Sequence, residues 1–532
     1  MLTEPGCDHP EEVRIPGHDA GEKDVRRCHR VPGPADGDSP PGGCHRSPYA
    51  LTFLRVIDAV AKTRQGLVRG LGQDGIVSFK GIPFAAAPEG ALRFQPPAPP
   101  ADWDGVRDAT AFGAAPPQLP PAPGVPPIWR PGDGLDCLTL NVWSPDPGAA
   151  GLPVMVWLYG GAWKVGSSGM PQYDGATLAR SGVVVVTVNY RVGFEGFGHL
   201  PGVPDNRGLR DQIAALEWVR DNVAAFGGDP GNVTVFGQSA GAASVALLVA
   251  APAAEGLFRR AIAQSIPAGY HSVAEAEQIT GTLAAAAGVA ATREGFAALA
   301  PEAILAVQDV PLTGPAAGAS AFGPVVDGDL VTGPPWTGIR AGAARDVDLI
   351  CGFTHEEYRG LAPGGPPPGV APEAAAASLG LGEDAVAVYR DAHPGSSDAD
   401  LFAVMMSDAL VRMPTTWVAE AHARAGGRTW LYDFTWRGPL LGAGHGVDVP
   451  FTFGNGDGRF AARLVGSPPA AGFAALSERI RTAWTSFAAT GDPGWPRFDL
   501  EHRRTRIWDT TPSEAAYPLA DSYRVWERAA PR

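Results

Sequence analysis

The chain alternates short apolar runs with longer segments whose apolar positions recur at helical spacing. The segments 209–223, 240–250 and 476–490 have helical spacing. The apolar runs are shorter and rich in β-branched residues, which is typical of strands buried on both faces. These predicted strands are 154–159, 183–189, 233–237, 348–352 and 429–434. Strands alternating with helices predict an α/β fold, with a central, mostly parallel sheet flanked by helices. The Ala-rich segment 270–340 predicts a helical region inserted into that fold.

Residues 1–50 depart from this pattern. They contain almost no apolar run, yet hold three of the five Cys and four of the eleven His. A zinc site is one interpretation, but zinc ligands usually pair two to four residues apart. The pairs in question are Cys7 and His9, Cys28 and His29, and Cys44 and His45. We therefore expect 1–50 to be a disordered extension and 51–532 to form the folded domain.

Charge and composition exclude several classes of protein. The chain has 42 Lys and Arg against 56 Asp and Glu, a net charge of −14 with no dense basic run, unlike nucleic-acid binders. No apolar stretch reaches 18 residues, and the start lacks the pattern of a secretory signal. Five Cys in 532 residues do not describe a disulfide framework. We expect a cytoplasmic protein that binds neither nucleic acid nor membrane.

One motif suggests a nucleotide cofactor. Gly70, Gly72 and Gly75 have the G-x-G-x-x-G spacing of a dinucleotide fingerprint. That fingerprint needs a helix after it, so that the helix N-terminus can hold the pyrophosphate. Here 76–79 reads as a strand, so the glycines predict a hairpin turn instead.

A second motif points to a nucleophile. Gly237-Gln-Ser239-Ala-Gly241 is the only G-x-S-x-G in the chain, and it lies between the predicted strand 233–237 and the helix 240–250. A Ser at such a sharp turn projects its hydroxyl above the sheet, and the glycines allow close backbone approach. This context predicts that Ser239 is a nucleophile.

A Gly-rich turn upstream complements this serine. Gly160, Gly161, Ala162 and Trp163 follow the predicted strand 154–159. Such a turn can direct bare backbone N–H groups at one point, as a hydrolase needs for a tetrahedral oxyanion.

Together these motifs resemble the type-B carboxylesterase family, the cholinesterase-like branch of the α/β-hydrolase fold, and in particular its bacterial members. The resemblance runs from about residue 60 to the C-terminus, and it implies a Ser–Glu–His triad without metal or cofactor. The matching segments are 79–85, 92–94, 136–143, 160–162, 189–193, 226–230, 237–241, 258–265, 323–328, 352–357 and 442–446.

The resemblance assigns the remaining catalytic roles. It implies that Glu357 is the acid, with the adjacent Glu356 as the alternative, and that His445 is the base. The chain order Ser239, Glu357, His445 is the order this fold uses. It also implies an oxyanion hole made by the N–H groups of Gly161, Ala162 and Ala240.

Other residues have less specific roles. Ser265 matches a second serine that supports the triad in the family, although Ile266 replaces the usual Gly beside it. Gln238 stands where many members have Glu. Trp163 and Gly160 are candidate pocket residues, with a core position as the alternative for Trp163. Trp129 is a candidate cation-binding residue, but its spacing differs from the family's.

These observations predict a serine carboxylesterase that forms an acyl-enzyme on a small-molecule ester, acting as a monomer. A hydrolase of amides or carbamates with the same triad is one alternative, because the same groups attack both bonds. A non-catalytic interaction protein is another, but such relatives typically lack a triad residue.

Overall fold

The computed structural model describes residues 57–120, 124–312, 320–343 and 345–527, all within one compact unit, Leu54–Arg532. The predicted extension 1–50 and its Cys–His pairs lie outside the described residues. Among the helices of the described part, none combines the length and apolar character needed to cross a membrane.

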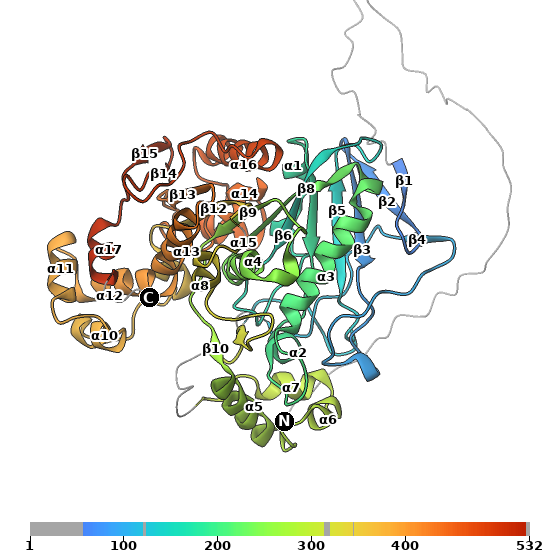
Figure 1. Ribbon diagram of the computed structural model, residues 1–532, viewed down its shortest axis with the longest axis horizontal. Helices are drawn as coiled ribbons and strands as arrows, with labels where there is room; N and C mark the ends of the chain where they lie inside the picture. The colour runs from blue at the N-terminus through green and yellow to red at the C-terminus, as the bar shows by residue number, and fades with distance from the viewer. Residues whose placement is uncertain (1–56, 121–123, 313–319, 344, 528–532) are drawn as a thin grey trace, which may run out of the picture. The chain divides into compact units, whose positions relative to one another are not determined.

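A mixed, 13-stranded sheet forms the centre of this unit (Figure 1). Its strands are β1 (Ile57–Lys62), β2 (Leu67–Gln73), β3 (Ile76–Pro83), β4 (Val106–Asp108), β5 (Thr139–Ser144), β6 (Leu152–Leu158), β7 (Val184–Val188), β8 (Gly228–Gln238), β9 (Arg260–Gln264), β12 (Asp348–Thr354), β13 (Thr429–Phe434), β14 (Thr505–Trp508) and β15 (Ser513–Ala515). The order is β1-β2-β3-β5-β7-β6-β8-β9-β12-β13-β14-β15, and β4 pairs with β2. Neighbours from β7 to β14 are parallel, whereas the pairs along β1-β2-β3-β5-β7 and β14-β15 are antiparallel.

The sequence located the parallel centre of the sheet. The five predicted strands correspond to β6, β7, β8, β12 and β13, although β8 begins earlier, at Gly228. The G-x-G-x-x-G segment 70–75 forms the predicted hairpin, because β2 pairs antiparallel with β3 and Gln73 lies opposite Ile76.

Helices cover the sheet, so that every residue of β12 and β13 is buried. α4 packs against β8 and β9 and α13 against β12, whereas α16 packs against β6 and β8. The helix predicted at 240–250 has those bounds, and the other two predicted helices begin two or three residues earlier. The helices of this group are α1 (Ala176–Ala179), α2 (Gly193–Phe197), α3 (Arg207–Asn222), α4 (Ala240–Ala250), α8 (Pro335–Arg340), α13 (Met413–Arg424), α14 (Val449–Phe453), α15 (Gly458–Val465), α16 (Phe473–Thr490) and α17 (Ala520–Trp526).

Two further groups of helices interrupt the α/β alternation (Figure 1). The predicted region contains α5 (Val273–Ala287), α6 (Arg293–Ala297) and α7 (Pro301–Val307), between the short parallel strands β10 (His271–Ser272) and β11 (Val325–Val326). The second group, between β12 and β13, was not predicted, because its short helices are separated by Gly and Pro and have no extended periodicity. It comprises α9 (Glu357–Leu361), α10 (Pro372–Ser378), α11 (Ala385–Ala392), α12 (Asp398–Ser407) and the π-helical turn Asp408–Arg412.

Candidate active site

Ser239 lies at the sharp turn between β8 and α4. Its φ of 59° and ψ of −127° are unusual for a residue with a side chain and place it at the N-cap of α4. A Cβ on Gly241 would overlap the carbonyl oxygen of Leu158 at the end of β6. The glycine therefore lets the helix start pack directly on the neighbouring strand.

The Gly-rich turn lies beside this serine. A Cβ added to Gly160 would lie 2.8 Å from the Cβ of Ser239. Gly161 and Ala162 have positive φ values of 136° and 54°. Among the described residues, no acceptor is hydrogen-bonded to the N–H of Gly161, Ala162 or Ala240. The turn thus presents unpaired donors next to the hydroxyl-bearing residue.

Glu357 and His445 meet although 88 residues separate them. Glu357 is fully buried at the start of α9, and its Oε2 is hydrogen-bonded to His445 Nδ1. Only 10% of the His445 side chain is exposed. Close approach requires Gly360, where a Cβ would overlap the backbone of His445. Sequence reasoning missed Gly360, because nothing local to it signals a contact with the histidine loop.

Glu356 has a different set of partners. Its Oε2 accepts a hydrogen bond from Ala443 N–H at 3.0 Å, and its Oε1 pairs with Arg359 and Arg437. The structure therefore places Glu357, and not Glu356, against the imidazole. Glu356 instead holds the loop that carries His445.

Ser265 supports Glu357 from behind. Its hydroxyl donates to Glu357 Oε1 at 2.6 Å, and Thr354 N–H donates to the same oxygen at 2.8 Å. The contact forms with Ile266 in place of Gly, and the Ile266 N–H donates to Thr415 Oγ1 at 3.0 Å. Both carboxylate oxygens of Glu357 are thus satisfied, which fixes its orientation toward His445.

Two polar residues near His445 were not assigned a role from the sequence. Gln238 Nε2 lies 3.0 Å from His445 Nε2. Asp448, at the N-cap of α14, is buried, and that burial raises its pKa to about 6. Its Oδ2 accepts from Gln264 Nε2 at 2.8 Å, while its Oδ1 has no hydrogen-bond partner in the part of the chain that the structure describes. The short spacing between His445 and Asp448 is the sequence signal that could have found this acid.

The two candidate tryptophans are both buried. Trp163 is 4% exposed, and its Nε1 donates to Ser244 Oγ at 3.3 Å, which favours the core interpretation over a pocket wall. Trp129 packs with Ala115 and Leu305, and its Nε1 donates to Gly134 O at 3.1 Å. Its ring is therefore engaged in packing and does not form the suspected cation site.

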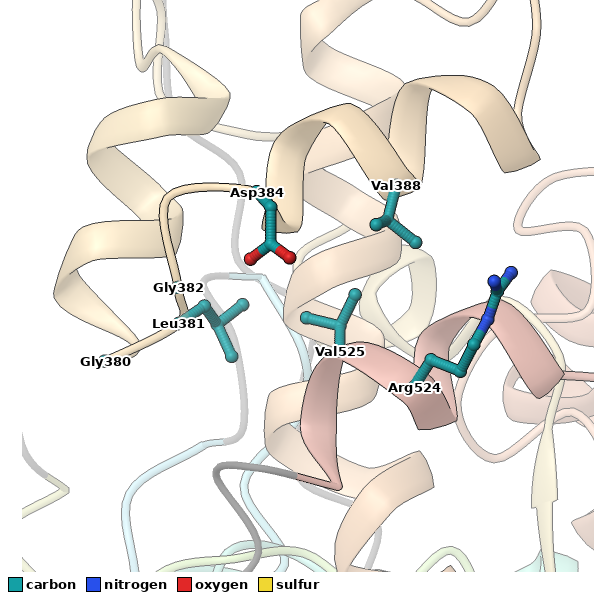
Figure 2. A pocket seen from close by; sticks show the side chains of 7 residues that line it. All are labelled: Gly380, Leu381, Gly382, Asp384, Val388, Arg524 and Val525. Atoms are coloured by element: carbon teal, nitrogen blue, oxygen red, sulfur yellow. The ribbon is translucent and has the colours of Figure 1, made fainter.

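Away from the predicted site residues, the described part of the chain has a hollow but no metal-binding cluster. No group of three or more His, Cys, Asp or Glu side chains there is arranged to hold a metal ion. A hollow of about 290 Å³ lies where side chains of α11 and α17 face each other (Figure 2). Its lining residues, which include none of the predicted site residues, are Gly380, Leu381, Gly382, Asp384, Val388, Arg524 and Val525.

Known proteins resemble this chain over most of its length. The model of the carboxylesterase family matches residues 57–521. The chain is 37% identical to para-nitrobenzyl esterase of Bacillus subtilis (strain 168), over 85% of this chain and 95% of the relative. It is 35% identical to fumonisin B1 esterase of Sphingopyxis macrogoltabida, over 83% of this chain and 84% of the relative. The crystal structure of Geobacillus stearothermophilus carboxylesterase EST55 superposes with a TM-score of 0.78 at 34% identity, covering 88% of this chain and 99% of that one.

The sheet, its flanking helices and this structural similarity define an α/β-hydrolase fold. The chain belongs to the carboxylesterase family. It is a carboxylic ester hydrolase, as the resemblance implied.

Proposed function

We propose that Ser239, His445 and Glu357 form the catalytic triad of this esterase. The observation that carries the proposal is the buried Glu357–His445 pair at the end of the sheet where the strained Ser239 turn also lies. Neutral His445 takes the Ser239 proton as the hydroxyl attacks the ester carbonyl. It then gives that proton to the leaving alcohol, while Glu357 stabilises the imidazolium. Water hydrolyses the acyl-enzyme by the same proton relay.

The N–H groups of Gly161, Ala162 and Ala240 bind the oxyanion in this proposal. Their lack of acceptors among the described residues supports the role, because unpaired donors can bind the developing charge without first breaking another hydrogen bond. Ala240 is the first residue of α4, so the positive end of the helix dipole adds to the same effect. Ser265 acts by orienting Glu357.

We also propose the range of substrates and the setting. The similarity to a para-nitrobenzyl esterase favours para-nitrobenzyl esters as substrates. The buried thiols of Cys137 and Cys351, neither of them in a disulfide, support a cytoplasmic location. The similarity to an esterase of Bacillus subtilis (strain 168) supports a bacterial enzyme. We propose a monomer, and sedimentation velocity tests this directly.

Labelling and substitution of Ser239 test the proposed triad. An organophosphate should attach to Ser239, and mass spectrometry of the digested protein locates the adduct. Ser239→Ala should lower kcat on a para-nitrobenzyl ester by a factor on the order of 10⁶. A matched panel of esters and anilides should show faster turnover of the esters, since the alcohol is the better leaving group. An adduct confined to another serine, with Ser239→Ala fully active, contradicts the assignment.

A further inference from the structure

Gln238 lies between two parts of the proposed catalytic apparatus. It is the last residue of β8, and only 6% of it is exposed. Its amide nitrogen lies 3.0 Å from His445 Nε2. Its amide oxygen lies on the side of the Gly-rich turn, where a Cβ on Gly160 would approach it to 3.1 Å. The side chain therefore spans the space from that turn to the histidine loop.

The chemistry of the two groups fixes the direction of the hydrogen bond. His445 Nδ1 is paired with the carboxylate of Glu357, so Nδ1 carries the proton and Nε2 of the neutral ring carries the lone pair. A side-chain NH₂ has no acceptor capacity. Gln238 therefore donates to the lone pair of Nε2.

That lone pair is the one that must accept the Ser239 proton. Among the described residues, none is hydrogen-bonded to the Ser239 hydroxyl. The structure thus shows the base engaged by Gln238 and the nucleophile unengaged. Ser239 must displace the amide of its own neighbour before the attack begins.

We propose that Gln238 is a positioning residue that holds the His445 ring by donating to Nε2 until the Ser239 hydroxyl takes its place; this inference rests on the proposed triad. A donor at Nε2 stabilises the neutral ring. It opposes the imidazolium, because the Nε2–H of that form would face the N–H groups of the Gln238 amide. The charged groups around the ring act in the opposite sense. Glu357 on α9 contacts it directly, and Asp448 at the start of α14 attracts the imidazolium through space. The buried Tyr432 phenol on β13 stays protonated and contacts Asp448 at 3.3 Å.

The pH dependence of catalysis separates this role from a merely structural one. Gln238→Glu places a carboxylate that accepts from the imidazolium, so the acid limb of kcat/KM should move to higher pH by about one unit or more. Gln238→Met removes the donor without adding a charge, so its acid limb should fall between those of wild type and Gln238→Glu. The exposed Gln73→Glu, on the β2–β3 hairpin, adds the same charge elsewhere and should leave the profile unchanged.

A second measurement remains usable when the variants turn over the ester too slowly for a pH profile. The rate of organophosphate inactivation reads the nucleophilicity of Ser239 without completing a catalytic cycle, and its acid limb should shift in the same order. Variants that lose rate equally at every pH, with an unmoved acid limb in both assays, overturn the proposal for Gln238. Full activity of Ser239→Ala would instead overturn the triad, so the two failures are distinguishable.

Discussion

At the scale of single residues, the adjacent carboxylates of Glu356 and Glu357 have different partners. Glu357 is fully buried and bonded to His445, whereas Glu356 faces the other way and is bonded to Ala443 N–H. Glu357→Gln should lower kcat by about 10⁴, because the amide no longer fixes the imidazole tautomer or stabilises its charge. Steady-state kinetics on one soluble ester measures the loss, with circular dichroism to verify folding.

Variants of Glu356 provide the matched controls for that prediction. Glu356→Gln should stay within about tenfold of wild type, since its amide oxygen still accepts from Ala443 N–H. Glu356→Ala should lose more, because that N–H then lacks its acceptor and the histidine loop loosens. If Glu356→Gln is the crippled variant and Glu357→Gln is not, the acid has been assigned one residue too late.

The residues predicted from the sequence and those missed differ in a physical way. Ser239, Glu357 and His445 each follow a predicted strand, and parallel strands bring such positions to one edge of the sheet. Gln238 and Gly360 depend on the packing of one loop against another far away in sequence. Neither contact has a local pattern, so sequence reasoning alone does not find it.

At the scale of elements, the β8–α4 turn depends on a close approach of backbones. A Cβ on Gly241 would overlap Leu158 O and lie 2.8 Å from Tyr159 O, and neither backbone oxygen can move without shifting β6. Gly241→Ala should therefore destabilise the fold by about 3 kcal/mol, as expected for an overpacked site. The midpoint of urea unfolding measures this loss.

Gly281 offers a matched glycine elsewhere. It lies exposed inside α5, and a Cβ there would meet nothing within 4 Å. Gly281→Ala should leave stability unchanged or raise it by up to about 1 kcal/mol, because Ala favours the helix. Equal losses in the two variants would refute the close-packing explanation for Gly241.

The elements themselves were predictable where the apolar pattern was long and regular. The buried strands and α4 fall into this class, whereas the antiparallel edge and the helices between β12 and β13 do not. Asn206 also escaped a local reading. It stands at the N-cap position of α3, but its side chain does not cap the helix: its amide nitrogen donates to Val325 O at 2.8 Å, and its φ is 57°. A tertiary contact with β11 replaces the local cap.

At the scale of the whole molecule, buried charge is mostly paired. Arg191 and Asp211 form a bidentate pair, and Arg93 pairs with Glu195. Asp448 differs, because within the described ranges its buried Oδ1 has no hydrogen-bond partner and no Arg or Lys is bonded to the carboxyl. Burial of an acid without a cation favours its protonated form, which couples its titration to global unfolding.

Asp448→Asn should reveal this coupling. Burial raises the pKa of Asp448 from 3.8 to about 6, so as pH rises through this window the unfolded chain ionises first. Unfolding is thereby favoured, and the group's contribution to stability falls by about 2 kcal/mol between pH 4 and pH 6 and changes little above pH 7. The variant has no titrating carboxyl at this position, but its amide oxygen can still accept a hydrogen bond from Gln264 Nε2. Relative to wild type, its unfolding free energy should therefore rise by about that amount from pH 4 to pH 7, measured by urea titration at each pH.

Asp74→Asn, in the exposed β2–β3 turn, is the matched control and should follow the wild-type curve. Parallel curves for Asp448→Asn and wild type would mean that Asp448 is ionised in the folded protein and costs it no stability.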